Sequence, residues 1–257
     1  MLDLTTLGTA TDRPPLLIAH GLFGSARNWR AIARHMSEDR RVLSVDMRNH
    51  GSSFRSDTNS YFDMAGDLAD VVAAEGVAAD VLGHSMGGKA AMMLALTRPD
   101  LVNQLIVGDI SPVPYDHSQT GLVRAMAGLD LAGLASRGEA DRRLAAVVAD
   151  SGVRAFLLQS LDLKGEFPRW RLNLKVLERE MPRIMGWPEV DGTFGGPVLM
   201  LAGGDSDYVK PEHRIEIKRL FPNSRLVRIP GAGHWLHADK PREFETIVRN
   251  FLSNSNT

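Results

Sequence analysis

The sequence predicts an α/β fold: a doubly wound, mostly parallel sheet into which a helical segment is inserted. Short apolar runs recur along the chain without alternating polar residues, which is typical of strands buried on both faces of a parallel sheet. Helical patterns lie between these runs, and such alternation implies right-handed crossovers. Between about Ser111 and Gly196 the alternation stops and only helical patterns remain.

Six strands are predicted from the apolar runs, at residues 16–19, 42–45, 79–82, 105–107, 198–201 and 226–229. Apolar residues spaced i, i+3, i+4 and i+7 predict a helix at 29–36 and another at 244–251. Pro241 suits the first turn of the second helix. A run of small residues at 89–96 predicts a helix directly after the third strand.

The inserted segment is predicted at residues 112–195, between core segments at 1–111 and 196–257. It contains helical patterns at 142–148, 153–159 and 170–180, and no strand is predicted there. A segment this small cannot bury all its apolar residues internally, so some of them should face the sheet. We expect five large apolar side chains to contact a substrate: Phe23, Met126, Phe156, Trp170 and Trp235.

Composition fits a soluble protein without an unusual partner. Of the 257 residues, 44% are hydrophobic and 24% charged, and 30 Lys and Arg residues balance 31 Asp and Glu residues, so no nucleic-acid partner is expected. The absence of cysteine excludes disulfides and thiolate chemistry. Without a signal-peptide pattern or a run of about 18 apolar residues, we expect a cytoplasmic protein that does not interact with a membrane. The oligomeric state stays open.

The most informative motif is Gly-x-Ser-x-Gly at residues 83–87, with Ser85 at its centre. A predicted strand precedes it and a predicted helix follows, as a nucleophilic serine on a sharp turn requires. Such a turn lifts the hydroxyl away from the backbone and places it at a helix N-terminus. The same pattern could be a glycine-rich turn without chemistry, so the interpretation depends on the partners of Ser85.

A nucleophilic serine needs a base, and the base needs an acid that fixes its tautomer. His234 is the best-placed base, because it follows the last predicted strand and so emerges at the same sheet edge as the serine. Asp109 and Asp207 follow the fourth and fifth predicted strands, and topology allows either to be the acid; Asp205 is a weaker third candidate. Among the other histidines, we expect His84 to pack beneath the serine turn, and the following to be structural or solvated: His35, His50, His117 and His213.

The oxyanion of an acyl transfer needs amide donors that already point at it. The Met86 amide, directly after the serine, is one candidate. The second should come from the glycine-containing loop 20–24, where we favour the Leu22 amide and keep the Phe23 amide in reserve.

With these pieces in place, the chain resembles an α/β-hydrolase from about residue 14 to residue 252. Four segments, 20–25, 46–53, 83–89 and 231–237, resemble the small esterase subfamily of the bacterial YbfF-like proteins and their mitochondrial abhydrolase relatives. The resemblance implies a helical cap, Ser85 as nucleophile and His234 as base. It favours Asp109 over Asp207, because this subfamily often lacks a carboxylate at the later position.

The resulting hypothesis is a serine carboxylesterase that cleaves small carboxylic esters through an acyl-enzyme, without a metal or organic cofactor. A thioester substrate stays an alternative. A second alternative is a carbon–carbon bond hydrolase acting on a ring-cleavage diketone, which would want a basic pocket built from the available arginines, namely Arg124, Arg154, Arg169 and Arg171. A third is a ligand-binding protein that keeps the fold without catalysis.

Overall fold

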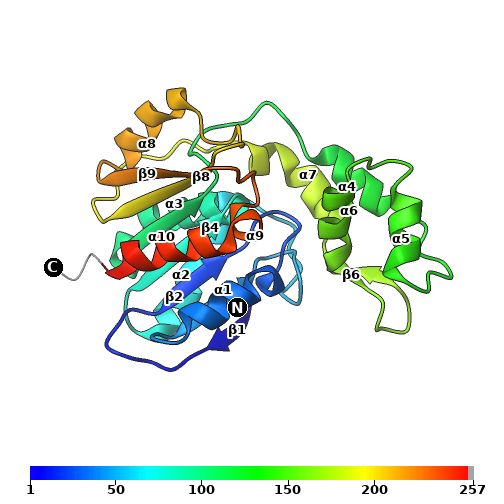
Figure 1. Cartoon of the computed structure of the whole chain (residues 1–257), viewed down its shortest axis with the longest axis horizontal. Coiled ribbons are helices and arrows are strands. Elements are labelled where there is room, and N and C mark those ends of the chain that lie inside the picture. The colour runs from blue at the N-terminus through cyan, green and yellow to red at the C-terminus, as the bar shows by residue number, and fades with distance from the viewer. Residues whose placement is uncertain (254–257) are drawn as a thin grey trace.

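The computed structural model describes residues 1–253, in which a seven-stranded sheet is covered by helices on both faces (Figure 1). The strand order is β1-β3-β2-β4-β5-β8-β9, and every neighbouring pair is parallel except β1 with β3. The strands are β1 (Asp3–Leu7), β2 (Leu16–Ala19), β3 (Val42–Asp46), β4 (Ala79–His84), β5 (Val102–Gly108), β8 (Val198–Gly203) and β9 (Ser224–Ile229). This arrangement confirms the predicted fold class and contains all six predicted strands.

The first strand was not predicted, and its surroundings explain why. β1 lies at the edge of the sheet, where it pairs only with β3, and its residues are exposed or half-buried. An exposed edge strand does not need a run of apolar residues, so the pattern that revealed the other strands is missing here.

Two apolar layers hold the helices to the sheet. On one face Leu16 and Ile18 pack with α1 (Arg30–Met36) and α10 (Pro241–Ser253). On the other face Leu17 and Ala19 belong to an apolar layer that also includes residues of the elements α2 (Tyr61–Glu75), α3 (Met86–Thr97) and α8 (Arg214–Leu220). Alternate residues of one strand thus serve both layers, as the side-chain period of two requires.

The segment between β5 and β8 carries four α-helices and lies to one side of the sheet (Figure 1). They are α4 (Thr120–Ala127), α5 (Arg137–Leu144), α6 (Ser151–Leu157) and α7 (Leu174–Met185). We call residues 112–195 the inserted segment. The Tyr61 hydroxyl of α2 donates a 2.5 Å hydrogen bond to the Ile184 carbonyl oxygen, which fastens this segment to the core.

The expectation that the inserted segment contains no strand was wrong. Two short strands, β6 (Leu161–Asp162) and β7 (Arg169–Trp170), pair antiparallel there. The helix predicted at 170–180 therefore begins only at Leu174, because Trp170 belongs to the hairpin. The helix predicted at 142–148 instead starts at Arg137, where the Ser136 side chain caps it by accepting from the Glu139 amide.

Candidate active site

Ser85 occupies a strained turn between β4 and α3. Its φ of 52° and ψ of −120° lie in a region that non-glycine residues rarely adopt. The two flanking glycines are required by close packing: a Cβ on Gly83 would lie 2.2 Å from the Gly87 carbonyl oxygen, and one on Gly87 would lie 2.4 Å from the Ala19 carbonyl oxygen. The turn places the Ser85 side chain at the N-terminus of α3, facing the loop after β9.

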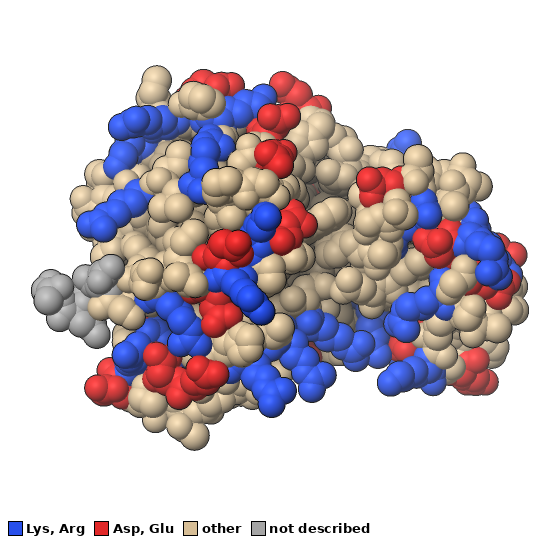
Figure 2. Space-filling view, viewed as in Figure 1, with Lys and Arg blue, Asp and Glu red and all other residues tan. Residues whose placement is uncertain are grey.

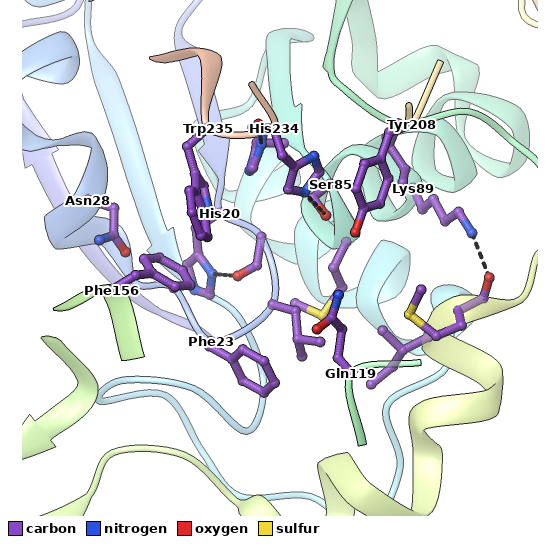
Figure 3. Close-up of a pocket in the computed structure, with 18 of the residues that line it drawn as sticks. His20, Phe23, Asn28, Ser85, Lys89, Gln119, Phe156, Tyr208, His234 and Trp235 are labelled. Carbon is purple, nitrogen blue, oxygen red and sulfur yellow. Dashed lines mark hydrogen bonds between the residues drawn. The ribbon is translucent and has the colours of Figure 1, made fainter. Parts of the chain in front are cut away.

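Ser85, His234 and Asp109 form a continuous hydrogen-bonded chain, whose first bond is drawn in Figure 3. The His234 Nε2 lies 3.1 Å from the Ser85 Oγ, and its Nδ1 lies 2.8 Å from an oxygen of Asp109. An Nδ1–H that donates to the carboxylate leaves Nε2 free to accept the serine proton. The three residues follow β4, β9 and β5, which end at one edge of the parallel sheet.

Asp109 is fully buried and has a strained backbone with φ of 47°. Its second oxygen accepts a 2.9 Å hydrogen bond from the Gly203 amide, and the Ser206 hydroxyl donates to the oxygen that also faces His234. Asp207, the alternative acid, is exposed, and the His234 Nδ1 is bonded to Asp109 rather than to it. Sequence reasoning missed Ser206, which lies far from Asp109 in the chain and belongs to no recognised motif.

Two backbone amides near Ser85 lie free. Among residues 1–253, neither the Leu22 amide nor the Met86 amide has a hydrogen-bond partner. The Phe23 amide, held in reserve, is engaged instead, because it donates a 3.2 Å bond to the His50 Nε2. Leu22 and Met86 both line the cavity that contains Ser85.

Two rings flank the His234 imidazole. Tyr208 stacks on it with the ring centroids 3.9 Å apart and the planes 19° apart, as Figure 3 shows. His84 lies 4.8 Å away and donates a 2.8 Å hydrogen bond from Nε2 to the His234 carbonyl oxygen. Burial holds the pKa of His84 well below its ordinary value, so this second imidazole stays neutral beside the first.

A cavity of about 240 Å³ opens onto Ser85 and His234. It lies where the space-filling view is hollowed between the core and the inserted segment, a region with few charged side chains (Figure 2). Most lining side chains are apolar or aromatic: Leu22, Phe23, Trp29, Ile110, Leu122, Val153, Phe156, Ile184, Met185 and Trp235.

Of the five side chains expected to contact substrate, Phe23, Phe156 and Trp235 line this cavity. The expectation for Met126 and Trp170 is corrected, since neither residue lines it. The Trp170 indole donates a 2.8 Å hydrogen bond to the Met126 carbonyl oxygen, and both residues pack within the inserted segment. Apolar character alone could not tell residues that hold this segment together from residues that face the cavity.

Lys89 is buried one turn after the nucleophile and also lines the cavity. Its ammonium donates to three carbonyl oxygens of the inserted segment, those of Val113 at 2.8 Å, Met185 at 3.2 Å and Gly186 at 2.6 Å. Burial lowers the pKa of Lys89 to about 7. With all three hydrogens engaged, the ammonium has no donor left for a substrate carboxylate.

The arginines that could have formed a basic pocket are engaged in ion pairs away from the cavity. Arg124 pairs with Glu178 at 2.6 Å and Arg154 with Asp141 at 2.7 Å. Arg169 and Arg171 both face the carboxylate of Asp162, at 3.7 Å and 3.0 Å. None of these four arginines lines the cavity.

Residues 1–253 contain neither a cluster of metal-binding side chains nor a helix that could span a membrane. No group of three or more His, Asp or Glu side chains in this part of the chain is arranged to hold a metal ion. In the same range, no helix is both long enough and apolar enough to cross a membrane.

The chain is similar in sequence and structure to known hydrolases. The family model described as "Alpha/beta hydrolase family" matches residues 16–247. The chain is 43% identical to the "sn-1-specific diacylglycerol lipase ABHD11" of Mus musculus, over 93% of this chain and 81% of that protein. It is 36% identical to "Esterase YbfF" of Escherichia coli, over 94% of each chain. A solved structure titled "Marine microorganism esterase" superposes with a TM-score of 0.92 at 36% identity, covering 97% of this chain and 98% of the other.

Proposed function

The chain belongs to the alpha/beta hydrolase family and to its esterases and lipases, and we propose that it is a serine carboxylesterase that cleaves small, uncharged carboxylic esters. The observation that carries this proposal is the hydrogen-bonded chain from Ser85 through His234 to Asp109, beside two unpartnered amides. A nucleophile, a base with its tautomer fixed and waiting oxyanion donors are what acyl transfer requires.

In the proposed mechanism, His234 accepts the Ser85 proton as the serine oxygen attacks the ester carbonyl. The amides of Leu22 and Met86 donate hydrogen bonds to the resulting oxyanion. His234 then protonates the departing alkoxide, which leaves the acyl group on Ser85. Water, deprotonated by the same histidine, attacks the acyl-enzyme and releases the acid. Asp109 accepts a hydrogen bond from the imidazolium and stabilises it in both halves of the cycle.

The cavity supports an uncharged substrate. Its lining is mostly apolar, and the ammonium of Lys89, which belongs to this lining, is saturated by backbone carbonyls. The mouse relative is named as a lipase of diacylglycerol, an uncharged lipid ester, and the bacterial relative is named as an esterase; both names agree with this choice. Residues 112–195 would act as the cap that shields the ester from bulk water.

The rival carbon–carbon bond hydrolase is less well supported. Its diketone substrate carries a carboxylate, and the four arginines considered for binding that group form ion pairs elsewhere. A non-catalytic ligand-binding role leaves unexplained why a nucleophile, base, acid and free amides converge. No step of the proposed reaction needs a metal or an organic cofactor.

The experiment is hydrolysis of p-nitrophenyl esters with acyl chains from acetate to dodecanoate, by the wild type and by Ser85→Ala. We expect turnover by the wild type only, fastest with the shorter chains that the cavity accommodates. The p-nitrophenyl ester of succinic acid, with its free carboxylate, serves as the matched control and should be a much poorer substrate than the butyrate. Absence of turnover with every ester, or equal turnover by Ser85→Ala, would rule the proposal out.

A further inference from the structure

We propose that His50 is a positioning residue of the loop at residues 20–24, which we call the oxyanion loop. It holds the Phe23 amide away from the reacting atoms, so that the Leu22 amide is the one that donates to the oxyanion. The inference rests on the proposed function, because it concerns the same site. It assigns a role to His50, which lies in the segment 46–53 and was expected from the sequence to be structural or solvated.

The contacts of His50 fix its protonation. Nδ1 lies 2.8 Å from the Arg48 carbonyl oxygen, which can only accept, so Nδ1 carries the proton. In the neutral ring Nε2 is then an acceptor, and it lies 3.2 Å from the Phe23 amide nitrogen. The ring is fully buried, and burial lowers the pKa of His50 to about 3, so the neutral form prevails at neutral pH.

Two successive peptide planes in the loop are each held by a histidine. His20 Nδ1 lies 2.7 Å from the Gly21 carbonyl oxygen, which also accepts a 3.0 Å bond from the Gly24 amide. Since a peptide unit is planar and trans, fixing this carbonyl also fixes the Leu22 N–H, which points the opposite way. His50 holds the next plane through the Phe23 amide.

The backbone at Phe23 needs this support. Its φ of 65° is unusual for a residue with a side chain, and such conformations persist only where the surroundings impose them. The cost of this conformation is comparable to what a buried hydrogen bond contributes. If the bond to His50 is removed, the peptide between Leu22 and Phe23 can rotate toward a relaxed conformation and disturb the free Leu22 amide.

His50 is itself held rigidly. Its own amide donates a 3.0 Å bond to the Met47 carbonyl oxygen, and the Asp46 carboxylate accepts from the Ser52 amide at 2.7 Å. The neighbouring Asn49 carbonyl accepts a 2.9 Å bond from the Asn173 amide at the start of α7. The support of the oxyanion loop therefore extends into the inserted segment.

The test compares His50→Gln with His50→Asn. A glutamine places an amide oxygen where Nε2 stands and can still accept from Phe23, whereas asparagine is too short to do so and keeps only the donor toward Arg48. Since losing an oxyanion donor costs roughly a hundred- to a thousandfold in turnover, we expect His50→Asn to lose at least about tenfold in kcat with KM little changed. His50→Gln should retain most of the wild-type kcat.

A second readout separates positioning from a general structural role. A trifluoromethyl ketone forms a tetrahedral adduct with a nucleophilic serine and needs the same amide donors. Its affinity for His50→Asn should fall in parallel with kcat, while that for His50→Gln should not. Equal kcat and equal ketone affinity in both variants and the wild type would overturn the inference, and so would equal losses in both variants.

A measurement on the wild type needs no substitution. When the ketone binds, the backbone amide proton resonance of Leu22 should move downfield, and that of Phe23 should stay near its free position because it remains bonded to His50. A downfield shift of Phe23 instead would overturn the inference. If the wild type neither hydrolyses esters nor binds the ketone, the proposed function itself fails, which distinguishes the two outcomes.

Discussion

At the scale of single residues, backbone strain is concentrated at the candidate site. Within residues 1–253, four residues other than glycine have positive φ: Phe23, Asn49, Ser85 and Asp109. Two of them belong to the proposed triad, one to the oxyanion loop, and Asn49 precedes the histidine that supports this loop. Such strain persists where hydrogen bonds and packing impose it, and it aims side chains and amides that a relaxed backbone would misdirect.

The acid can be identified by substitution. Asp109→Asn should reduce kcat by roughly a thousandfold or more, because an amide in place of the carboxylate no longer stabilises the imidazolium or selects the tautomer that leaves Nε2 free. The matched change Asp207→Asn should leave kcat near the wild-type value, because Asp207 lies exposed on a loop. Ester hydrolysis by the two purified variants checks this, and the opposite ranking would make Asp207 the acid.

Local motifs and strand order were enough to select Ser85 and His234 from the sequence, because a parallel sheet collects its strand ends at one edge. They left Asp109 and Asp207 as alternative acids, and only the resemblance to the esterase subfamily favoured Asp109. Neither motifs nor strand order could predict that Ser206 bonds Asp109, that Tyr208 stacks on His234, or that buried His50 accepts from the Phe23 amide. Each of these residues acts through a contact with a distant part of the chain, and no periodicity or short motif encodes such a contact.

At the scale of elements, Lys89 joins the nucleophile helix α3 to the inserted segment. Its ammonium bonds carbonyl oxygens at two places in that segment, Val113 near its start and Met185 and Gly186 at the end of α7. The face of the Tyr115 ring lies 4.7 Å from the ammonium. One side chain thereby sets the position of both places relative to Ser85.

Replacing this lysine should therefore affect both stability and substrate binding. Lys89→Met keeps the length and removes the three donors, so the free energy of unfolding should fall by about 1–3 kcal/mol and KM should rise. Lys218→Met is a matched control, because that lysine bonds the Pro222 and Ser224 carbonyl oxygens outside the cavity lining. It should leave KM unchanged. Urea unfolding and ester kinetics provide the two measurements, and an unchanged KM in Lys89→Met would contradict this role.

Strands that contain a run of apolar residues were predictable as elements, while the others were not. The six predicted strands each contain such a run, including β9 at the second edge of the sheet, whereas β1 is a partly exposed edge strand without one, and β6 and β7 have only two residues each. Helix α10 was predicted near its observed bounds because Pro241 marks its start. In the inserted segment, capping residues such as Ser136 set the helix bounds better than apolar spacing did.

At the scale of the whole molecule, the fold keeps several imidazoles neutral in its interior. Burial lowers the pKa of His20 and His84, and it lowers the pKa of His50 and His237 to about 3. At His50 and His237 the unfolded chain binds protons between pH 6.5 and about 3, and the native state does not. Stability must therefore fall as the pH falls through this window.

His237 offers a clean test of this linkage. Its ring stacks on Trp29 with centroids 4.1 Å apart and packs near Phe244, so His237→Phe substitutes an aromatic ring that cannot be protonated. The variant should lose less stability on acidification than the wild type, by up to about 1.4 kcal/mol per pH unit between pH 6 and 4. Denaturant unfolding at several pH values gives the comparison, and parallel curves for the two proteins would refute it.

The arrangement of the whole chain followed from a simple sequence property, the alternation of buried strands with helices and its interruption by one helical segment. The shape of the cavity did not follow, because it depends on which side of each inserted helix faces the sheet. Met126 and Trp170 illustrate this: their size and apolarity were read correctly, but their side chains pack within the inserted segment.

The central claim, that Ser85 carries the acyl group, is tested most directly by intact-protein and peptide mass spectrometry after reaction with a fluorophosphonate ester. We predict a single stable adduct on the peptide that contains Ser85, no adduct in Ser85→Ala, and much slower labelling in His234→Ala because the base is missing. An active wild type that gains no adduct, or an adduct on another residue that persists in Ser85→Ala, would contradict the claim.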